Sequence, residues 1–144
     1  MGAGTSVGRD VLDKLGLKPG QAVRIVGQGE PRLLARVRAR VRRRLANAGL
    51  RADLVLYWPR NAAEVTKTLV RLRAAVFPQG AIWVVTAKRG RRGFNGMEYL
   101  AAAELIPLGL AAGLVDNKIC SVSEAETAMR FVWRRGDRSQ KGKG

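Results

Sequence analysis

The residues best suited to chemistry in this sequence are cations set between glycines, directly after a strongly apolar stretch. Residues 81–87 are short, apolar and rich in β-branched and aromatic side chains, which predicts a strand buried on both faces, as in parallel α/β sheets. In such sheets ligands bind outside the carboxyl ends of the strands. The segment 88–93 lies there, and its glycines can present N–H groups while its cations bind phosphate: Lys88, Arg89, Arg91 and Arg92.

A second group of cations falls on an expected helix over residues 31–48. Its apolar residues recur at helical spacing, and arginines cover most of the remaining surface with no acid between Pro31 and Ala52. Like charges three and four residues apart repel by roughly 0.2–0.5 kcal/mol per pair, which favours a use for the charge. The candidates for phosphate contact are Arg36, Arg40, Arg43 and Arg44. The plainer alternatives are a solvated helix face in an Arg-rich proteome and a solvated, mobile loop.

The composition narrows the classes of function. The net charge of +16 comes from 27 Lys and Arg against 11 Asp and Glu, and a field of this sign attracts polyanions, nucleic acid first. The chain has no His, which removes His-based general bases, Ser-His triads and His metal ligands. Its one cysteine, Cys120, forms no intramolecular disulfide and no zinc-binding pair. We therefore predict no catalytic residue and no metal site.

The expected elements follow the order β-α-β-α-β-α-β-β. Right-handed crossovers make the first three strands parallel, and a short turn makes the last two an antiparallel hairpin. We expect strands at 22–26, 53–58, 81–87, 114–122 and 127–134, and helices at 31–48, from Asn61 to a turn at 78–80, and from Asn95 to a break at Pro107. One domain over 10–135 then lies between a flexible N-terminus, 1–9, and a basic disordered tail, 136–144. No apolar stretch is long enough to span a bilayer, which predicts a soluble, cytoplasmic protein with no membrane partner.

Several stretches together resemble a small bacterial family catalogued only as a domain of unknown function. They are LDKLGLKPG (12–20), ADLVL (52–56), PQGAIWV (78–84), GLVDNKICSV (113–122) and RFVWR (130–134). That family in turn resembles a shortened methyltransferase-type Rossmann fold. The resemblance implies a three-layer α/β domain with a five-stranded sheet ordered 1-2-3-5-4, three parallel strands being followed by the antiparallel hairpin.

The resemblance also implies a cofactor site at Gly27 and Gly29, because methyltransferases of this fold hold S-adenosylmethionine at a glycine turn after the first strand. The sequence departs from that pattern in three ways. Ile25 stands where an acid usually precedes the turn, Pro31 takes the place of a third glycine, and the strand whose acid holds the ribose is missing. A pair of glycines after a strand is also common in an ordinary tight turn.

These observations leave two main hypotheses and a weaker third. The first is a non-enzymatic Rossmann-like protein that binds nucleic acid, RNA or a ribonucleoprotein favoured, through the arginine-rich helix and the basic glycine-containing loop, without a cofactor. The alternative is a reduced S-adenosylmethionine-dependent methyltransferase-like enzyme with its cofactor at Gly27 and Gly29. The third is an adaptor that recognises a protein or membrane by charge. The helix start and the loop are expected at the carboxyl edge of the sheet, and the tail at the opposite edge.

Overall fold

A computed structural model describes residues 10–47 and 49–140 of the 144-residue chain. In chain order its elements are α1 (Val11–Lys14), β2 (Val23–Val26), α2 (Pro31–Val41), β3 (Ala52–Tyr57), the 3-10 turn η1 (Ala62–Glu64), α3 (Val65–Ala75), β4 (Val76–Ala87), α4 (Ala102–Ala111), β5 (Leu114–Ser121), β6 (Glu126–Trp133) and α5 (Arg135–Gln140). The expected N-terminal segment 1–9 and the residues 141–144 lie outside this description. No helix within the described ranges has the length and apolar character needed to cross a membrane.

The strands form one sheet in the order β2-β3-β4-β6-β5. β2, β3 and β4 pair in parallel, whereas β6 is antiparallel to both β4 and β5. Counted in chain order this arrangement is 1-2-3-5-4, so the predicted sheet is confirmed. One row across the strands joins Leu56, Trp83, Arg130 and Lys118.

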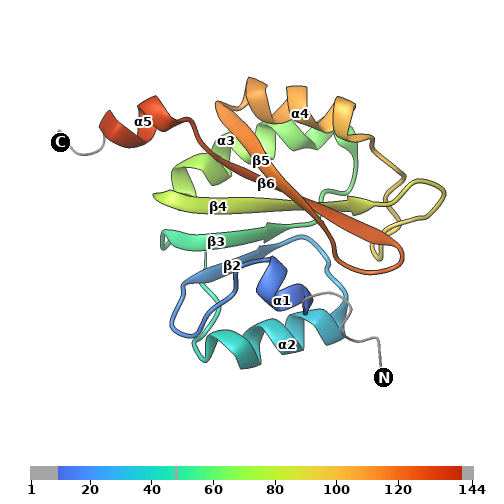
Figure 1. Cartoon of the computed structure of the whole chain (residues 1–144), viewed down its shortest axis with the longest axis horizontal. Coiled ribbons are helices and arrows are strands. Elements are labelled where there is room, and N and C mark those ends of the chain that lie inside the picture. Colours follow the sequence, from blue (N-terminus) through green and yellow to red (C-terminus); the bar gives the residue numbers. More distant parts are fainter. Residues whose placement is uncertain (1–9, 48, 141–144) are drawn as a thin grey trace.

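Helices cover the two faces of the sheet unequally (Figure 1). α1 and α2 pack on one face, where Leu56, Trp58 and Trp83 contribute to one buried cluster. α3 and α4 pack on the other, where Tyr57 and Phe131 belong to a second cluster. Alternate residues of β3 therefore point into different cores, as the pleat of a strand requires. The three-layer α/β class is confirmed.

α2 is shorter than the helix expected over 31–48. It ends at Val41, where Arg42 takes a left-handed conformation with φ 53° and ψ 38°. The chain then turns back, and the N–H of Ala46 donates to the carbonyl of Val23 at 2.7 Å. The run of arginines offers no attractive side-chain pair that would extend the helix, and this bond to β2 satisfies the backbone instead. Arg43 and Arg44 consequently lie in the loop after α2.

Two further boundaries differ from the sequence prediction because tertiary packing overrides local turn signals. β4 begins at Val76 and runs through 78–80, where a Cβ on Gly80 would lie 2.6 Å from the carbonyl oxygen of Asp53 in β3. α4 begins at Ala102 and continues through Pro107. Its Gly109 packs against the Phe131 ring, which holds the helix on the sheet despite the hydrogen bond lost at proline.

The segment after β6 also differs from expectation. Residues 135–140 form the short helix α5, although 136–144 was expected to be disordered. A carboxylate oxygen of Asp137 lies 2.9 Å from the guanidinium of Arg73, and the Trp133 indole donates to the carbonyl of Arg73 at 3.0 Å. These contacts give the start of the tail a fixed place beside α3.

Candidate functional site

The carboxyl edge of the sheet carries the glycine turn that the sequence singled out, and Trp58 fills it. Gly27 has φ 91°, and a Cβ there would lie 2.2 Å from the carbonyl oxygen of Trp58. A Cβ on Gly29 would lie 2.8–2.9 Å from three carbons of the Trp58 indole ring. The indole is only 1% exposed. Both glycines are therefore required for close packing against the residue that follows β3.

This geometry is a direct test of the cofactor that the fold implies. A glycine turn that holds S-adenosylmethionine needs open space over the second glycine, and here an indole ring from the chain itself occupies that space. β2 is the edge strand of the described sheet, so no neighbouring strand supplies an acid for a ribose. The residues present at Gly27 and Gly29 do not fit the cofactor.

Glu126, which sequence reasoning missed, connects this packing to the basic loop. It is 4% exposed at the start of β6. One carboxylate oxygen accepts from the backbone N–H of Phe94 at 3.0 Å, and the other from the Trp58 indole at 3.4 Å. A buried carboxylate is retained only with such donors. A lone acid in a polar turn carries no sequence pattern that would reveal this role.

The basic loop, residues 88–93, has polar contacts but little neutralising charge. The Lys88 ammonium donates to the Ser121 hydroxyl at 2.6 Å, and the Arg89 guanidinium lies 5.3 Å from the centroid of the Tyr99 ring. Arg92 donates to the carbonyl of Gly96 at 3.0 Å and lies 3.8 Å from the Glu98 carboxylate. One acid therefore faces four cations, and the loop remains a positive surface.

A cavity of about 440 Å³ brings the start of α2 and the basic loop together at this edge. Arg32 and Arg36 line it from α2, Arg92 from the loop, and the half-exposed Phe94 ring lies beside them. Its apolar lining comes from Val11, Leu33, Val122 and Ala125, and its acids are Glu30 and Glu126. The cavity thus brings together three guanidinium groups and one exposed aromatic ring, although Arg36 also pairs with Asp10 and Arg92 with Glu98.

The eight cations proposed from the sequence do not form one surface. Arg36 pairs with Asp10, and Arg40 bonds to Asp13 at 2.9 Å and to Asp10 at 3.3 Å, so both hold α1 against α2. The hydrogen bond from Arg36 lowers the pKa of Asp10. Arg43 donates to the carbonyl of Gly20 before β2, and Arg44 is exposed nearby, at the opposite end of the sheet from the loop.

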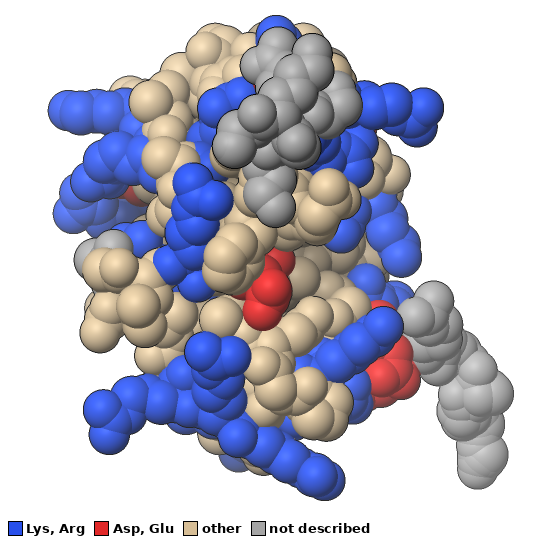
Figure 2. All heavy atoms as spheres, turned by 90° about the vertical axis from the view of Figure 1, so that its left-hand side faces the viewer, with Lys and Arg blue, Asp and Glu red and all other residues tan. Residues whose placement is uncertain are grey.

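Figure 2 shows that opposite end, where the parallel strands begin, with Lys and Arg side chains around its rim and few acids. The acids that the chain does contain are mostly engaged in contacts within the structure. Nine of the eleven take part in ion pairs or accept hydrogen bonds: Asp10, Asp13, Glu30, Asp53, Glu64, Glu98, Glu104, Glu126 and Asp137. Within the described residues these ion pairs engage five arginines: Arg36, Arg40, Arg60, Arg73 and Arg92.

Known proteins resemble this chain mainly in fold. The S-adenosylhomocysteine-bound methyltransferase CalO1 of calicheamicin biosynthesis superposes with a TM-score of 0.61 at 17% identity, over 85% of this chain and 52% of that one, so this chain spans about half its length. A SAM-dependent methyltransferase from Aquifex aeolicus superposes with a TM-score of 0.65 at 15% identity, over 84% of this chain and 86% of that one. The CcbJ methyltransferase from Streptomyces caelestis superposes with a TM-score of 0.58 at 13% identity, over 85% of this chain and 87% of that one. At these identities the likeness establishes a methyltransferase-like Rossmann fold alone.

Sequence comparison adds the family. No curated protein matches the chain. Residues 12–135 match a family model described as "Protein of unknown function (DUF3052)". Because that model spans most of the sequence, this chain belongs to the DUF3052 family.

Proposed function

We propose that this protein binds nucleic acid through phosphate contacts, as a non-enzymatic Rossmann-like domain, with RNA as the expected partner. The observation that carries the proposal is the imbalance between acids and cations. Nine of the eleven acids are engaged, whereas 24 of the 27 Lys and Arg residues lie in the described part of the chain and ion pairs there use five of them. Excess charge of one sign repels itself, and a bound polyanion relieves that repulsion.

The distribution of the free cations favours an extended strand over one duplex groove. The basic loop and the 440 Å³ cavity lie at the carboxyl edge, and Arg43 and Arg44 lie at the other end of the sheet. Phe94 is 53% exposed beside Arg92, which suits stacking of an unpaired base next to a phosphate contact. Binding of this kind depends on backbone charge and reads little sequence.

The test is fluorescence anisotropy with labelled single-stranded RNA and a matched DNA duplex across a salt series. We expect sub-micromolar binding of RNA near physiological salt. Replacing Lys88, Arg89, Arg91 and Arg92 by Ala should flatten the salt dependence by about 0.7 per lost contact on a single strand. The matched control replaces the exposed α3 cations Lys67 and Arg71 by Ala and should leave the slope unchanged. Wild-type binding no tighter than about 10⁻⁴ M would refute the proposal.

The fold likeness favours a second candidate, a reduced methyltransferase-like enzyme, and lends no support to RNA binding. Neighbours of similar fold include an S-adenosylhomocysteine-bound methyltransferase. Against this candidate stands Trp58 in the glycine turn, which leaves the neighbouring 440 Å³ cavity as the place for a nucleotide ligand at this edge. Thermal unfolding with S-adenosylmethionine distinguishes the two. A ligand at about 100 times its Kd adds about 2.7 kcal/mol, and a flat response would exclude this candidate.

A further inference from the structure

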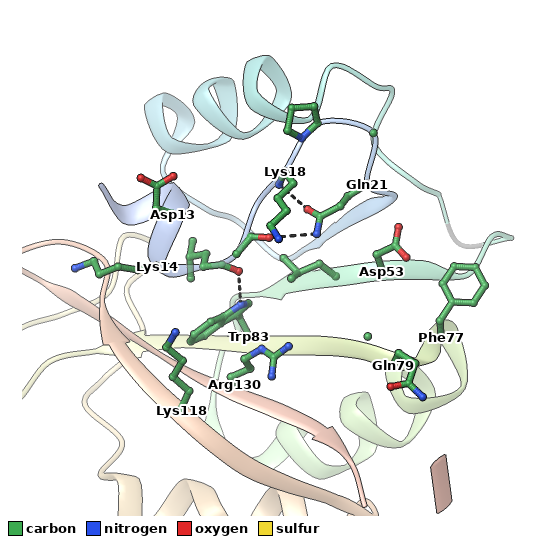
Figure 3. Close-up of a pocket in the computed structure, with 16 residues that line it drawn as sticks. Asp13, Lys14, Lys18, Gln21, Asp53, Phe77, Gln79, Trp83, Lys118 and Arg130 are labelled. Atoms are coloured by element: carbon green, nitrogen blue, oxygen red, sulfur yellow. Dashed lines mark hydrogen bonds between the residues drawn. The ribbon is translucent and has the colours of Figure 1, made fainter. Parts of the chain in front are cut away.

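A larger cavity, of about 830 Å³, lies on the face of the sheet that α1 and α2 cover only in part. α1 is four residues long and ends above Trp83, whose indole donates to the carbonyl of Leu15 at 2.9 Å. Among residues 10–47 and 49–140, no helix covers this face of the strands beyond this point (Figure 1). The cavity therefore has an apolar floor of Leu54 and Trp83 and a rim of polar side chains (Figure 3).

Cations gather at one side of this floor. Lys118 of β5 and Arg130 of β6 are register partners, and Arg130 is in turn the partner of Trp83 in β4. Figure 3 shows Lys118 and Arg130 beside the Trp83 indole, and Lys14 extending from α1 on the same side of the cavity but away from the indole. Burial raises the pKa of the Cys120 thiol, two residues from Lys118 on β5, and the charges of Lys14 and Lys118 act in the opposite direction.

Arg130 is the central group of this cluster. Its side chain is half-buried, and burial together with the positive charge of Arg138 lowers its pKa. Its guanidinium makes a long hydrogen bond, 3.4 Å, to the side-chain oxygen of Asn117, and no acid within the described residues forms an ion pair with it. A partly desolvated guanidinium with such weak compensation is suited to bind an anion.

The two acids that line the cavity are already engaged. Asp53 accepts from the backbone N–H of Ala22 at 2.8 Å, and Asp13 pairs with Arg40. Figure 3 shows Asp53 across the cavity from Lys118, near the exposed Phe77 and Gln79. The cation cluster therefore remains positive, while the far side offers an aromatic ring and an amide to an organic group.

We propose that this cavity binds a phosphate ester, with Arg130 and Lys118 as direct phosphate ligands and the attached organic group directed toward Phe77 and Gln79. A guanidinium donates two parallel N–H bonds to phosphate, and an ammonium adds a point charge. The volume falls within the range of about 300–1,000 Å³ usual for ligand pockets. The phosphate belongs either to a nucleic-acid strand, in which case the inference rests on the proposed function, or to a free nucleotide.

The experiment compares wild type with Arg130→Gln, Lys118→Gln and the charge-conserving Arg130→Lys, with Lys67→Gln on α3 as the matched control. Circular dichroism and urea unfolding test whether each variant folds. If Arg130→Gln does not fold, Lys118→Gln, at an exposed position, still tests the cavity. The probes are a labelled single-stranded uridine oligonucleotide, measured by anisotropy, and AMP and UMP. Nucleotide binding is measured by isothermal titration calorimetry.

For whichever probe the wild-type protein binds, we expect Arg130→Gln to weaken binding about tenfold or more, because a charged hydrogen bond is lost. Arg130→Lys should retain part of the affinity. Oligonucleotide binding that depends on Arg130 assigns the phosphate to a strand. Nucleotide binding that depends on Arg130, without oligonucleotide binding, supports the cavity while refuting the proposed function. Equal oligonucleotide binding by wild type, Arg130→Gln and Lys118→Gln, together with no nucleotide binding that depends on Arg130, overturns the inference and leaves the proposed function standing. No binding of either probe overturns both.

Discussion

Replacing Gly29 by alanine should destabilise the protein by overpacking the indole of Trp58. Gly29 does not have a positive φ, so an alanine there meets no backbone strain. Its Cβ would nevertheless lie 2.8, 2.8 and 2.9 Å from three indole carbons, well inside the 3.5–4.0 Å of an ordinary carbon contact. Overpacking of this kind costs about 1–3 kcal/mol, and the ordinary gain from Gly→Ala offsets about 0.4–1 kcal/mol of it.

The expected net loss is roughly 1–2 kcal/mol of unfolding free energy, which lowers the urea midpoint by about 0.5–1 M for an m-value near 2 kcal/mol/M. Gly49→Ala is the control, because its Cβ would meet only the Asn47 side-chain oxygen at 3.6 Å. A double-mutant cycle with Trp58→Phe, which removes the outer indole atoms, should recover about 1 kcal/mol as coupling. If Gly29→Ala and the control unfold alike and no coupling is found, the indole does not fill the turn and the cofactor site must be reconsidered.

Three other changes test the packing around the proposed surfaces. Glu126→Gln turns an amide N–H₂ toward one of two buried donors. We expect the free energy of unfolding to fall by about 1–3 kcal/mol and amide hydrogen exchange near Phe94 to become faster. Unchanged exchange would contradict the role of this carboxylate. Gly109→Ala should lower the urea midpoint further than Gly29→Ala, because its Cβ would lie 2.1 Å from an aromatic ring of β6. Burial, reinforced by Glu64, raises the pKa of Tyr57, so this phenol should stay protonated past pH 10. Its contribution to the free energy of unfolding should be lost only as alkaline pH ionises it. An absorbance titration compared with that of Tyr57→Phe would show an ordinary tyrosine ionisation if the reasoning is wrong.

The sheet was predictable because its strands combine apolar β-branched runs with short connections. The run 81–87 and the close spacing of the last two strands suffice for a parallel core and a terminal hairpin. Helix ends were harder to predict, since they depend on contacts between distant segments. Val41 ends α2 because the chain turns back to β2, and Pro107 is tolerated because Gly109 packs on Phe131. Neither partner can be read from the local sequence.

The candidate sites were predictable in charge but not in geometry. Cations at a strand end could be located in the sequence, yet the pairing of Arg36 and Arg40 with α1 depends on how the first helix packs. A glycine that admits a ligand and a glycine that admits an indole look identical in a sequence, so Gly29 was ambiguous. Arg130 reads as an ordinary polar position on an alternating strand. The 830 Å³ cavity that Arg130 lines is open because α1 ends after four residues, and no sequence motif predicts that helix end.

The two edge strands of the sheet, β2 and β5, affect whether copies of this chain associate edge to edge at high concentration. Exposed strand edges are templates on which a second molecule can add a strand, and aggregation often starts there. β2 presents only four residues, and the bond from Ala46 to Val23 occupies part of its edge. β5 is interrupted by a register shift between Asp116 and Lys118 and carries charge at that point. Strand-by-strand growth into fibres is therefore disfavoured from both sides, and the net charge of +16 adds repulsion between copies that approach edge to edge.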